Sequence, residues 1–169
     1  AGIASGVDVI LIPEIPYDIK KVAKAIKQRE KTGKKFSIIA CAEGAISKED
    51  ASLTKKEYKA IVKARNGRSV AYEVADELKE YLDSEIRVSC IGHSQRGGQP
   101  CPYDRLISTR FGIAGAKLVM AKDYGKLVVL KNNEVTAIAL AKSAGKLKIV
   151  DPHDPKVEEA KLLGITFGN

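Results

Sequence analysis

The sequence has little of several residue types on which particular kinds of site depend. Only 5% of its 169 residues are aromatic, so stacking platforms for nucleic-acid bases are scarce. Its 2 histidines and 3 cysteines lack the clustered spacing of a structural zinc site. Cys41, Cys90 and Cys101 are odd in number, and the first two fall in predicted buried strands. We interpret them as reduced thiols, as in a cytoplasmic protein.

Segments that would direct the chain to a membrane are also missing. No apolar run approaches the length needed to cross a bilayer, and no charged-then-apolar signal opens the chain. We therefore expect no membrane partner. The first residue is Ala1 rather than Met, in what reads as the end of a helix. We expect the chain to be a piece of a longer polypeptide.

Positive charge is what the sequence has in excess. The formal net charge is +8, which could indicate nucleic acid, an anionic surface or a phosphorylated ligand as partner. Most of the lysines are spread along predicted helices, and a lysine-rich helix face is usually exposed to solvent without binding a partner. Arginines cluster little and aromatic residues are few. We expect no nucleic acid as partner.

Apolar patterning predicts an α/β fold. Near-continuous apolar runs at residues 7–12 and 36–41 are typical of strands buried on both faces of a parallel sheet. Helical spacing follows each of them, with Asp18 and Ser69 as N-caps. Residues 126–130 and 135–140 fit a hairpin, because Asn132 and Asn133 between them tolerate positive φ.

The order of these elements sets the expected domain organisation. Strands that alternate with helices favour a three-layer domain with a largely parallel sheet. We expect this α/β domain to span residues 1–142. Residues 143–169 are predicted to form a C-terminal tail with a short helix that begins at Pro155.

Residues 86–112, IRVSCIGHSQRGGQPCPYDRLISTRFG, are the stretch around which the rest is organised. Residues 86–91 are predicted to form a buried strand that Gly92 breaks, and a glycine-rich loop follows. A helix is expected from about residue 103 to 122. Glycines allow close backbone approach, and the free amides of a helix start point at an anion. His93 and Arg96 add hydrogen-bond donors suited to a phosphate.

Functional side chains are expected at one edge of the sheet. Ligands of such sheets bind at the carboxyl ends of the strands. Three strand ends carry Pro13-Glu14, Glu43-Gly44 and Gly92-His93, and Arg96 follows closely. A phosphate needs the histidine and the arginine, whereas sugar hydroxyls need a carboxylate acceptor. The set therefore favours a phosphorylated sugar as ligand.

Each of these residues also has an ordinary structural explanation. Glu43 could cap the connection that follows it, His93 could be structural, and Arg96 could face solvent. The expected helix carries Arg105 and Arg110, which could serve intramolecular salt bridges. A single Arg-Gly-Gly is weak evidence for RNA binding. It is the conjunction of three such groups at one edge that favours a site.

The central stretch also resembles a known family. GHSQRGGQPCPYDRLISTRFG is similar to the sugar-phosphate loop of the 6-phosphofructokinase family, whose pattern is GHxQRGGxPxxxDR followed by xxRxG. The resemblance covers nearly the whole chain. AGIASGVDVILIPEIP resembles the segment just after the family's MGRxxG motif, and IIACAEGA resembles its strand that ends in a functional glutamate. The tail DPHDPKVEEAKLLGITFGN resembles the ending of the longer bacterial members. It implies the C-terminal, Rossmann-like half of an enzyme that phosphorylates fructose 6-phosphate to fructose 1,6-bisphosphate in glycolysis.

The resemblance implies a role for each matching residue. Glu43 would accept hydrogen bonds from the sugar, and His93 and Arg96 would hold the phosphate of fructose 6-phosphate. Arg87 would reach into a neighbouring subunit's site, which implies a homo-oligomer, either a dimer or a tetramer. Asp8 and Lys34 match an effector site of the shorter bacterial members, although Thr32 replaces a second basic residue there.

Other parts of the family pattern are missing. The GGDG donor loop, the TxDxD segment with the catalytic aspartate and the MGRxxG motif are not in this sequence. The resemblance therefore implies that Mg²⁺ with ATP or pyrophosphate binds mainly to another half, and that this chain alone is inactive. The alternative from another class is a non-catalytic regulatory module that binds an anion or a sugar phosphate.

Overall fold

In a computed structural model, which describes residues 1–169, the chain forms two compact units. Unit 1 comprises Ala1–Cys90 and Ile149–Asn169, and unit 2 comprises Ile91–Lys148. These units do not follow the expected division after residue 142. The last 21 residues belong to unit 1, because Val157 and Phe167 are buried in one of its apolar clusters.

Unit 1 contains a short parallel sheet and most of the helices. Its elements are β1 (Val9–Leu11), α1 (Ile19–Lys31), β2 (Ile39–Cys41), α2 (Lys48–Ala51), α3 (Lys55–Ala64), α4 (Val70–Lys79) and α7 (Pro155–Leu162). β1 pairs in parallel with β2, with Val9 opposite Ile39. On the opposite edge of β1, the Ile10 N–H donates to the Thr166 carbonyl over 2.9 Å. The C-terminal segment thus extends the sheet.

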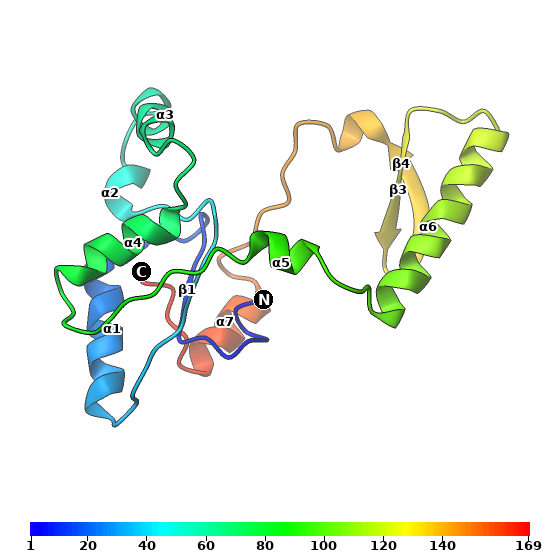
Figure 1. The fold of residues 1–169 in the computed structure, drawn as a ribbon. Helices are drawn as coiled ribbons and strands as arrows, with labels where there is room; N and C mark the ends of the chain where they lie inside the picture. Colours follow the sequence, from blue (N-terminus) through cyan, green and yellow to red (C-terminus); the bar gives the residue numbers. More distant parts are fainter. The chain divides into compact units, whose positions relative to one another are not determined.

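Helices cover both faces of β1 (Figure 1). Val9 and Leu11 are fully buried against residues of α1 and α4, among them Val22 and Leu78. Ile10, which alternates with them, packs on the opposite face against the cluster that contains residues of α7. This arrangement confirms the expected α/β fold, with β1 buried on both faces. The prediction of a second buried strand at residues 36–41 was wrong in its extent and burial, because β2 begins only at Ile39, is half-buried, and Phe36 is exposed.

Local capping chemistry explains where the helices begin and end. The Asp18 carboxylate accepts a 2.8 Å hydrogen bond from the Lys20 N–H, so α1 begins at the predicted N-cap. Gly33 adopts φ +85° after its last turn. Ser69 caps α4 in the same way as Asp18 caps α1. These helix ends were predictable because they depend on neighbouring residues alone.

The predicted strand at residues 86–91 does not form, and its prediction was wrong. Ile86 and Val88 are half-buried while Arg87 is exposed, so the alternation persists in extended chain. A strand also requires a partner for its backbone hydrogen bonds, and no backbone amide of residues 86–91 has one. Cys90 is consequently exposed rather than buried. The start of the chain, residues 1–6, forms turns rather than a helix end.

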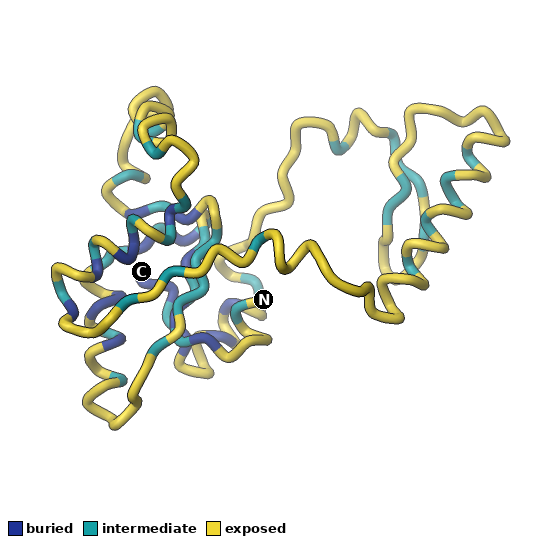
Figure 2. Tube along the Cα trace, in the orientation of Figure 1, coloured by how far each residue is buried: buried dark blue, intermediate teal, exposed yellow.

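Unit 2 consists of α5 (Gly92–Arg96), α6 (Pro102–Met120), β3 (Lys126–Lys131), β4 (Glu134–Ala139) and the 3₁₀ turn η1 (Leu140–Lys142). The strands form the predicted antiparallel hairpin, and Asn132 and Asn133 take φ values of +50° and +63° at its turn. No residue of unit 2 is buried (Figure 2). None of the helices combines the length and apolar character needed to cross a membrane.

Candidate functional site

His93 and Arg96 lie on the short helix α5 in unit 2. The helix is held by hydrogen bonds from the Gln95 N–H to the Ile91 carbonyl, 2.9 Å, and from the Gly97 N–H to the His93 carbonyl, 2.8 Å. Residues three apart on a helix are neighbours on its surface, so the imidazole and the guanidinium share one face. Both side chains are exposed. The structure thus brings the two predicted phosphate-binding residues together.

Two glycines permit this local geometry. A Cβ on Gly92 would lie 3.0 Å from Nη1 of Arg96, which donates to the Gly92 carbonyl over 3.1 Å. Gly92 therefore leaves room for the arginine to fold back on its own helix. Gly98 adopts φ +105°, a backbone conformation that residues other than glycine rarely adopt. The glycines thus serve the chain's own conformation, whatever ligand it binds.

The start of α6 is held by contacts within the motif. Pro102 opens the helix, and the Cys101 N–H donates to Oδ2 of Asp104 over 3.0 Å. Arg105 donates to the Pro100 carbonyl and Arg110 to the Asn133 carbonyl, both over 3.4 Å. The two helix arginines thus have intramolecular partners, but these are backbone carbonyls rather than the carboxylates of salt bridges.

Glu43 lies in unit 1, directly after the carboxyl end of β2. Its turn is fixed by a 3.0 Å hydrogen bond from the Ala45 N–H to the Ala42 carbonyl, and Ala45 is fully buried. The Ala42 N–H donates to the Leu11 carbonyl, so the turn continues the pairing of β2 with β1. The Glu43 side chain itself is exposed and has no hydrogen-bond or ion-pair partner. It does not cap the connection that follows.

Arg87 lies in the extended segment of unit 1 that was expected to be a strand. Its guanidinium pairs with the Glu85 carboxylate at 2.9 Å, and the two side chains are 83% and 73% exposed. An ion pair this exposed contributes little to stability. The arginine is therefore available to another partner.

Asp8 and Lys34, the candidate effector residues, are both connected to Arg29. The Asp8 carboxylate is 2.7 Å from the Arg29 guanidinium and also accepts the Ile38 N–H over 2.8 Å. Lys34 donates its backbone N–H to the Arg29 carbonyl over 3.2 Å, and its side chain is exposed. Asp8 thus joins α1 to the start of β2, and Arg29 is a basic residue that the sequence analysis missed.

A polar cluster around Arg65 was also missed. Arg65 is 9% exposed, pairs with Glu73 of α4 at 2.8 Å and lies 3.6 Å from Asp50 of α2. Its guanidinium lies over the ring of Tyr58 of α3, 5.8 Å from the centroid. The residue therefore links three helices. In the sequence it stands in a lysine-rich segment of the kind that is usually solvated, so no pattern distinguishes it.

Burial changes the acidity of groups near this cluster. Burial first, and then the Glu73 carboxylate, raises the pKa of the Cys41 thiol to about 11. Burial also raises the pKa of Glu77, helped by the carboxylates of Glu49 and Asp50. No group of three His, Cys, Asp or Glu side chains is placed to hold a metal ion.

The comparisons with known proteins agree with the resemblance. The family model described as Phosphofructokinase matches residues 1–119. An ATP-dependent 6-phosphofructokinase from Spirochaeta thermophila is 47% identical over 169 residues, and one from Chloroflexus aurantiacus is 41% identical; both matches cover all of this chain. This chain covers 46% of each relative, so it spans about half the length of these enzymes.

Solved structures give the same result for the fold. Pichia pastoris phosphofructokinase in the T-state matches 84% of this chain and 15% of its own, with a TM-score of 0.61 and 28% identity. The phosphofructokinase from Saccharomyces cerevisiae matches 98% of this chain and 19% of its own at a TM-score of 0.59 and 24% identity. The second match concerns the fold alone, and both confirm the α/β class.

Proposed function

Because the chain belongs to the phosphofructokinase family, we propose that it forms the fructose 6-phosphate-binding part of a 6-phosphofructokinase. The whole enzyme would phosphorylate fructose 6-phosphate to fructose 1,6-bisphosphate in glycolysis, in the cytoplasm. The observation that carries the proposal is that the motif from Gly92 to Arg110 lies within the residues that match the family model.

Each site residue has a chemical role in this proposal. Arg96 and His93 hold the phosphate, since a guanidinium offers two parallel donors and an imidazole a third. Glu43 accepts hydrogen bonds from the sugar hydroxyls, for which its unpartnered carboxylate is suited. The work of such a site is positioning and charge neutralisation rather than proton transfer.

The oligomer is part of the same proposal. The chain acts within a homo-oligomer, a dimer or a tetramer, in which Arg87 reaches the site of a neighbouring subunit. Its high exposure and its weak pairing with Glu85 support this role. Asp8 and Lys34 are proposed effector contacts. Asp8 would contact an effector together with Arg29, because the Arg29 guanidinium already forms an ion pair with its carboxylate.

The phosphoryl donor and the metal are proposed to bind mainly outside this chain. Phosphoryl transfer requires a clamped donor, a metal and a positioned base. The residues present here do not fit a magnesium site of their own, because no three acidic or other ligating side chains converge. We therefore expect the chain alone to be inactive. The relatives' names favour ATP over pyrophosphate as the donor.

Kinetics of the intact enzyme test the roles of His93 and Arg96. Arg96→Ala is expected to lower kcat/KM for fructose 6-phosphate roughly 10- to 100-fold, as for loss of a charged hydrogen bond. Arg68→Ala is the matched control, because Arg68 is an exposed arginine in an ion pair with Asp76. If Arg96→Ala has the kinetic constants of the unchanged enzyme, the proposed role is wrong.

A further inference from the structure

Unit 1 contains an open groove that none of the proposed substrate residues lines. Its volume is about 630 Å³, within the range of small-molecule sites. Apolar residues from two distant segments form one part of its wall: Ile15 and Pro16 after β1, and Pro152 before α7. Ile15 is 5% exposed and belongs to the core cluster packed around α7, so this wall is fixed by the fold.

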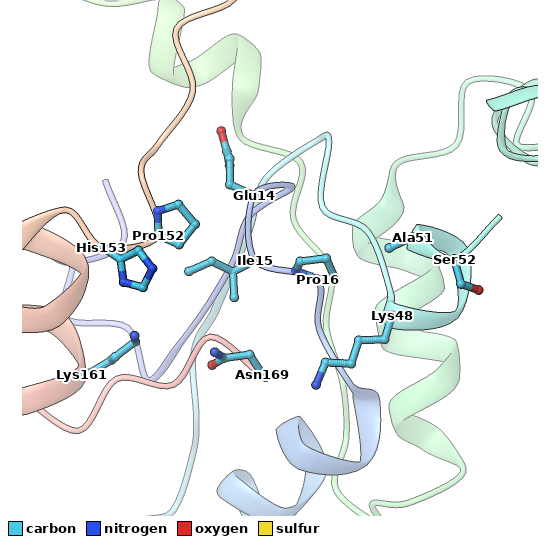
Figure 3. A pocket seen from close by; sticks show the side chains of 10 residues that line it. All are labelled: Glu14, Ile15, Pro16, Lys48, Ala51, Ser52, Pro152, His153, Lys161 and Asn169. Carbon is cyan, nitrogen blue, oxygen red and sulfur yellow. The ribbon is translucent and has the colours of Figure 1, made fainter. Parts of the chain in front are cut away.

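Basic side chains form the other part of the groove. Lys48 at the start of α2 and Lys161 near the end of α7 extend from opposite sides, and His153 lies next to Pro152 (Figure 3). Lys48 has no ion-pair partner, and Lys161 uses one donor on Glu158 at 2.8 Å. An ammonium group has three donors, so both lysines retain donors for a ligand.

The one acidic side chain of the groove has another partner. Oε1 of Glu14 accepts a 3.0 Å hydrogen bond from the Val150 N–H, a contact between residues 136 positions apart. Figure 3 shows the Glu14 carboxylate directed away from the two lysines. The Glu14 carboxylate thus holds the segment before Pro152 in place and pairs with neither lysine of the groove.

We propose that this groove binds a small organic anion, with a flat apolar body against Ile15, Pro16 and Pro152 and a phosphate head between Lys48 and Lys161. Pro16 and Pro152, backed by the buried Ile15, offer an apolar surface that a free inorganic ion would not use. Two ammonium groups on opposite sides suit a group with more than one negative charge. Glu43, His93 and Arg96 take no part in this site.

Phenyl phosphate is a suitable probe, because it combines an aromatic ring with a phosphate. Titration into the ¹⁵N-labelled chain, followed by amide NMR, should shift the signals of Ile15, Ser52 and His153. Lys48→Ala and Lys161→Ala should each weaken binding about three- to fivefold, as for loss of one exposed charged contact. Inorganic phosphate should bind more weakly than phenyl phosphate, and phenol should not bind.

Two neighbouring lysines serve as matched controls. Lys55→Ala on α3 and Lys156→Ala on α7 remove exposed charges outside the groove and should leave the affinity unchanged. An affinity that falls equally in all four variants would overturn the proposal, because it would report net charge alone. Shifts confined to α5 would also overturn it, while leaving the proposed sugar-phosphate site in place. If no amide signal of the groove residues shifts, the proposal is also wrong.

Discussion

The two units of this chain differ in what holds them together. Unit 1 has two clusters of buried residues, one on each face of β1, and its C-terminal segment closes the second cluster. Unit 2 has a helix of 19 residues and a hairpin of two six-residue strands, yet none of its residues is buried. Unit 2 is held instead by the hydrogen bonds of its hairpin and by contacts of α6 with half-buried residues of β3 and β4.

The difference bears on the proposed substrate-binding residues, because Glu43 belongs to unit 1 whereas His93 and Arg96 belong to unit 2. Glu43 lies in a turn that a fully buried alanine and a continued strand pairing hold in place. His93 and Arg96 lie on a helix of five residues with no buried side chain. Isolated helices this short are marginal in water, so we expect the phosphate-binding pair to be the less rigid part of the site.

Removal of a buried side chain from unit 1 should have the largest effect. Leu78 of α4 is 1% exposed, and Leu78→Ala should lower the free energy of unfolding of unit 1 by about 2–5 kcal/mol. Leu106→Ala is the matched control in unit 2, where Leu106 is 60% exposed, and it should cost less than about 1 kcal/mol. Urea titration of both variants measures the contrast. Equal losses would refute the stated difference between the units.

The Arg65 cluster should give the next largest effect. Arg65→Ala removes the ion pairs with Glu73 and Asp50 and leaves partly buried carboxylates without a partner. We expect a loss of about 1–3 kcal/mol in thermal or urea unfolding. Arg68→Ala, which removes an exposed pair, should cost less than about 1 kcal/mol. If the two variants are equally stable, Arg65 does not link the helices as described.

Thiol labelling compares the units through their cysteines. The pKa of Cys41 is raised to about 11, so at pH 8 roughly one thiol in a thousand is a thiolate. Cys90, at the end of the first part of unit 1, and Cys101 in unit 2 are exposed. Labelling with iodoacetamide at pH 8, followed by mass spectrometry, should modify these two well before Cys41. Labelling of Cys41 at the same rate would contradict its placement in β2.

A pH-dependent effect at Glu77 should be the smallest. Burial and the nearby carboxylates of Glu49 and Asp50 raise its pKa above the ordinary value of 4.5. A carboxyl whose pKa is higher in the folded state destabilises the fold once the pH exceeds that pKa. Glu77→Gln should therefore raise Tm at pH 7 by less than about 4 °C. The gain should vanish as the pH falls below 4.5, and a constant gain would point to another cause.

Local chemistry accounts for the parts of the fold that the sequence analysis predicted correctly. Asp18, Ser69 and the Asn132-Asn133 pair act on backbone within a few residues of themselves. The expected strand at residues 86–91 depended instead on a partner strand, and the segment pairs with none. Hydrophobic alternation thus matches the half-buried Ile86 and Val88, but it predicted neither the exposure of Cys90 and Ile91 nor the lack of backbone pairing.

The candidate sites also divide into features set by neighbouring residues and features that depend on distant segments. The position of Glu43 after β2 was predictable because the end of a strand can be located from a run of apolar residues, although β2 itself is only half-buried. The pairing of Glu14 with the Val150 amide, and of Arg65 with three helices, joins segments that no local pattern connects. The C-terminal segment was expected to be a tail because its residues are polar up to Pro155. Its buried residues, among them Ala160 and Phe167, find their partners only in the folded unit.

Calorimetric titration with fructose 6-phosphate tests the central claim most directly. The titration would be made on this chain combined with the other half of the enzyme, beside the Arg96→Ala and Arg68→Ala variants. We predict that the unchanged protein and Arg68→Ala bind the sugar phosphate equally, and that Arg96→Ala binds it at least about tenfold more weakly. Equal affinity of Arg96→Ala and the unchanged protein would contradict the proposed site.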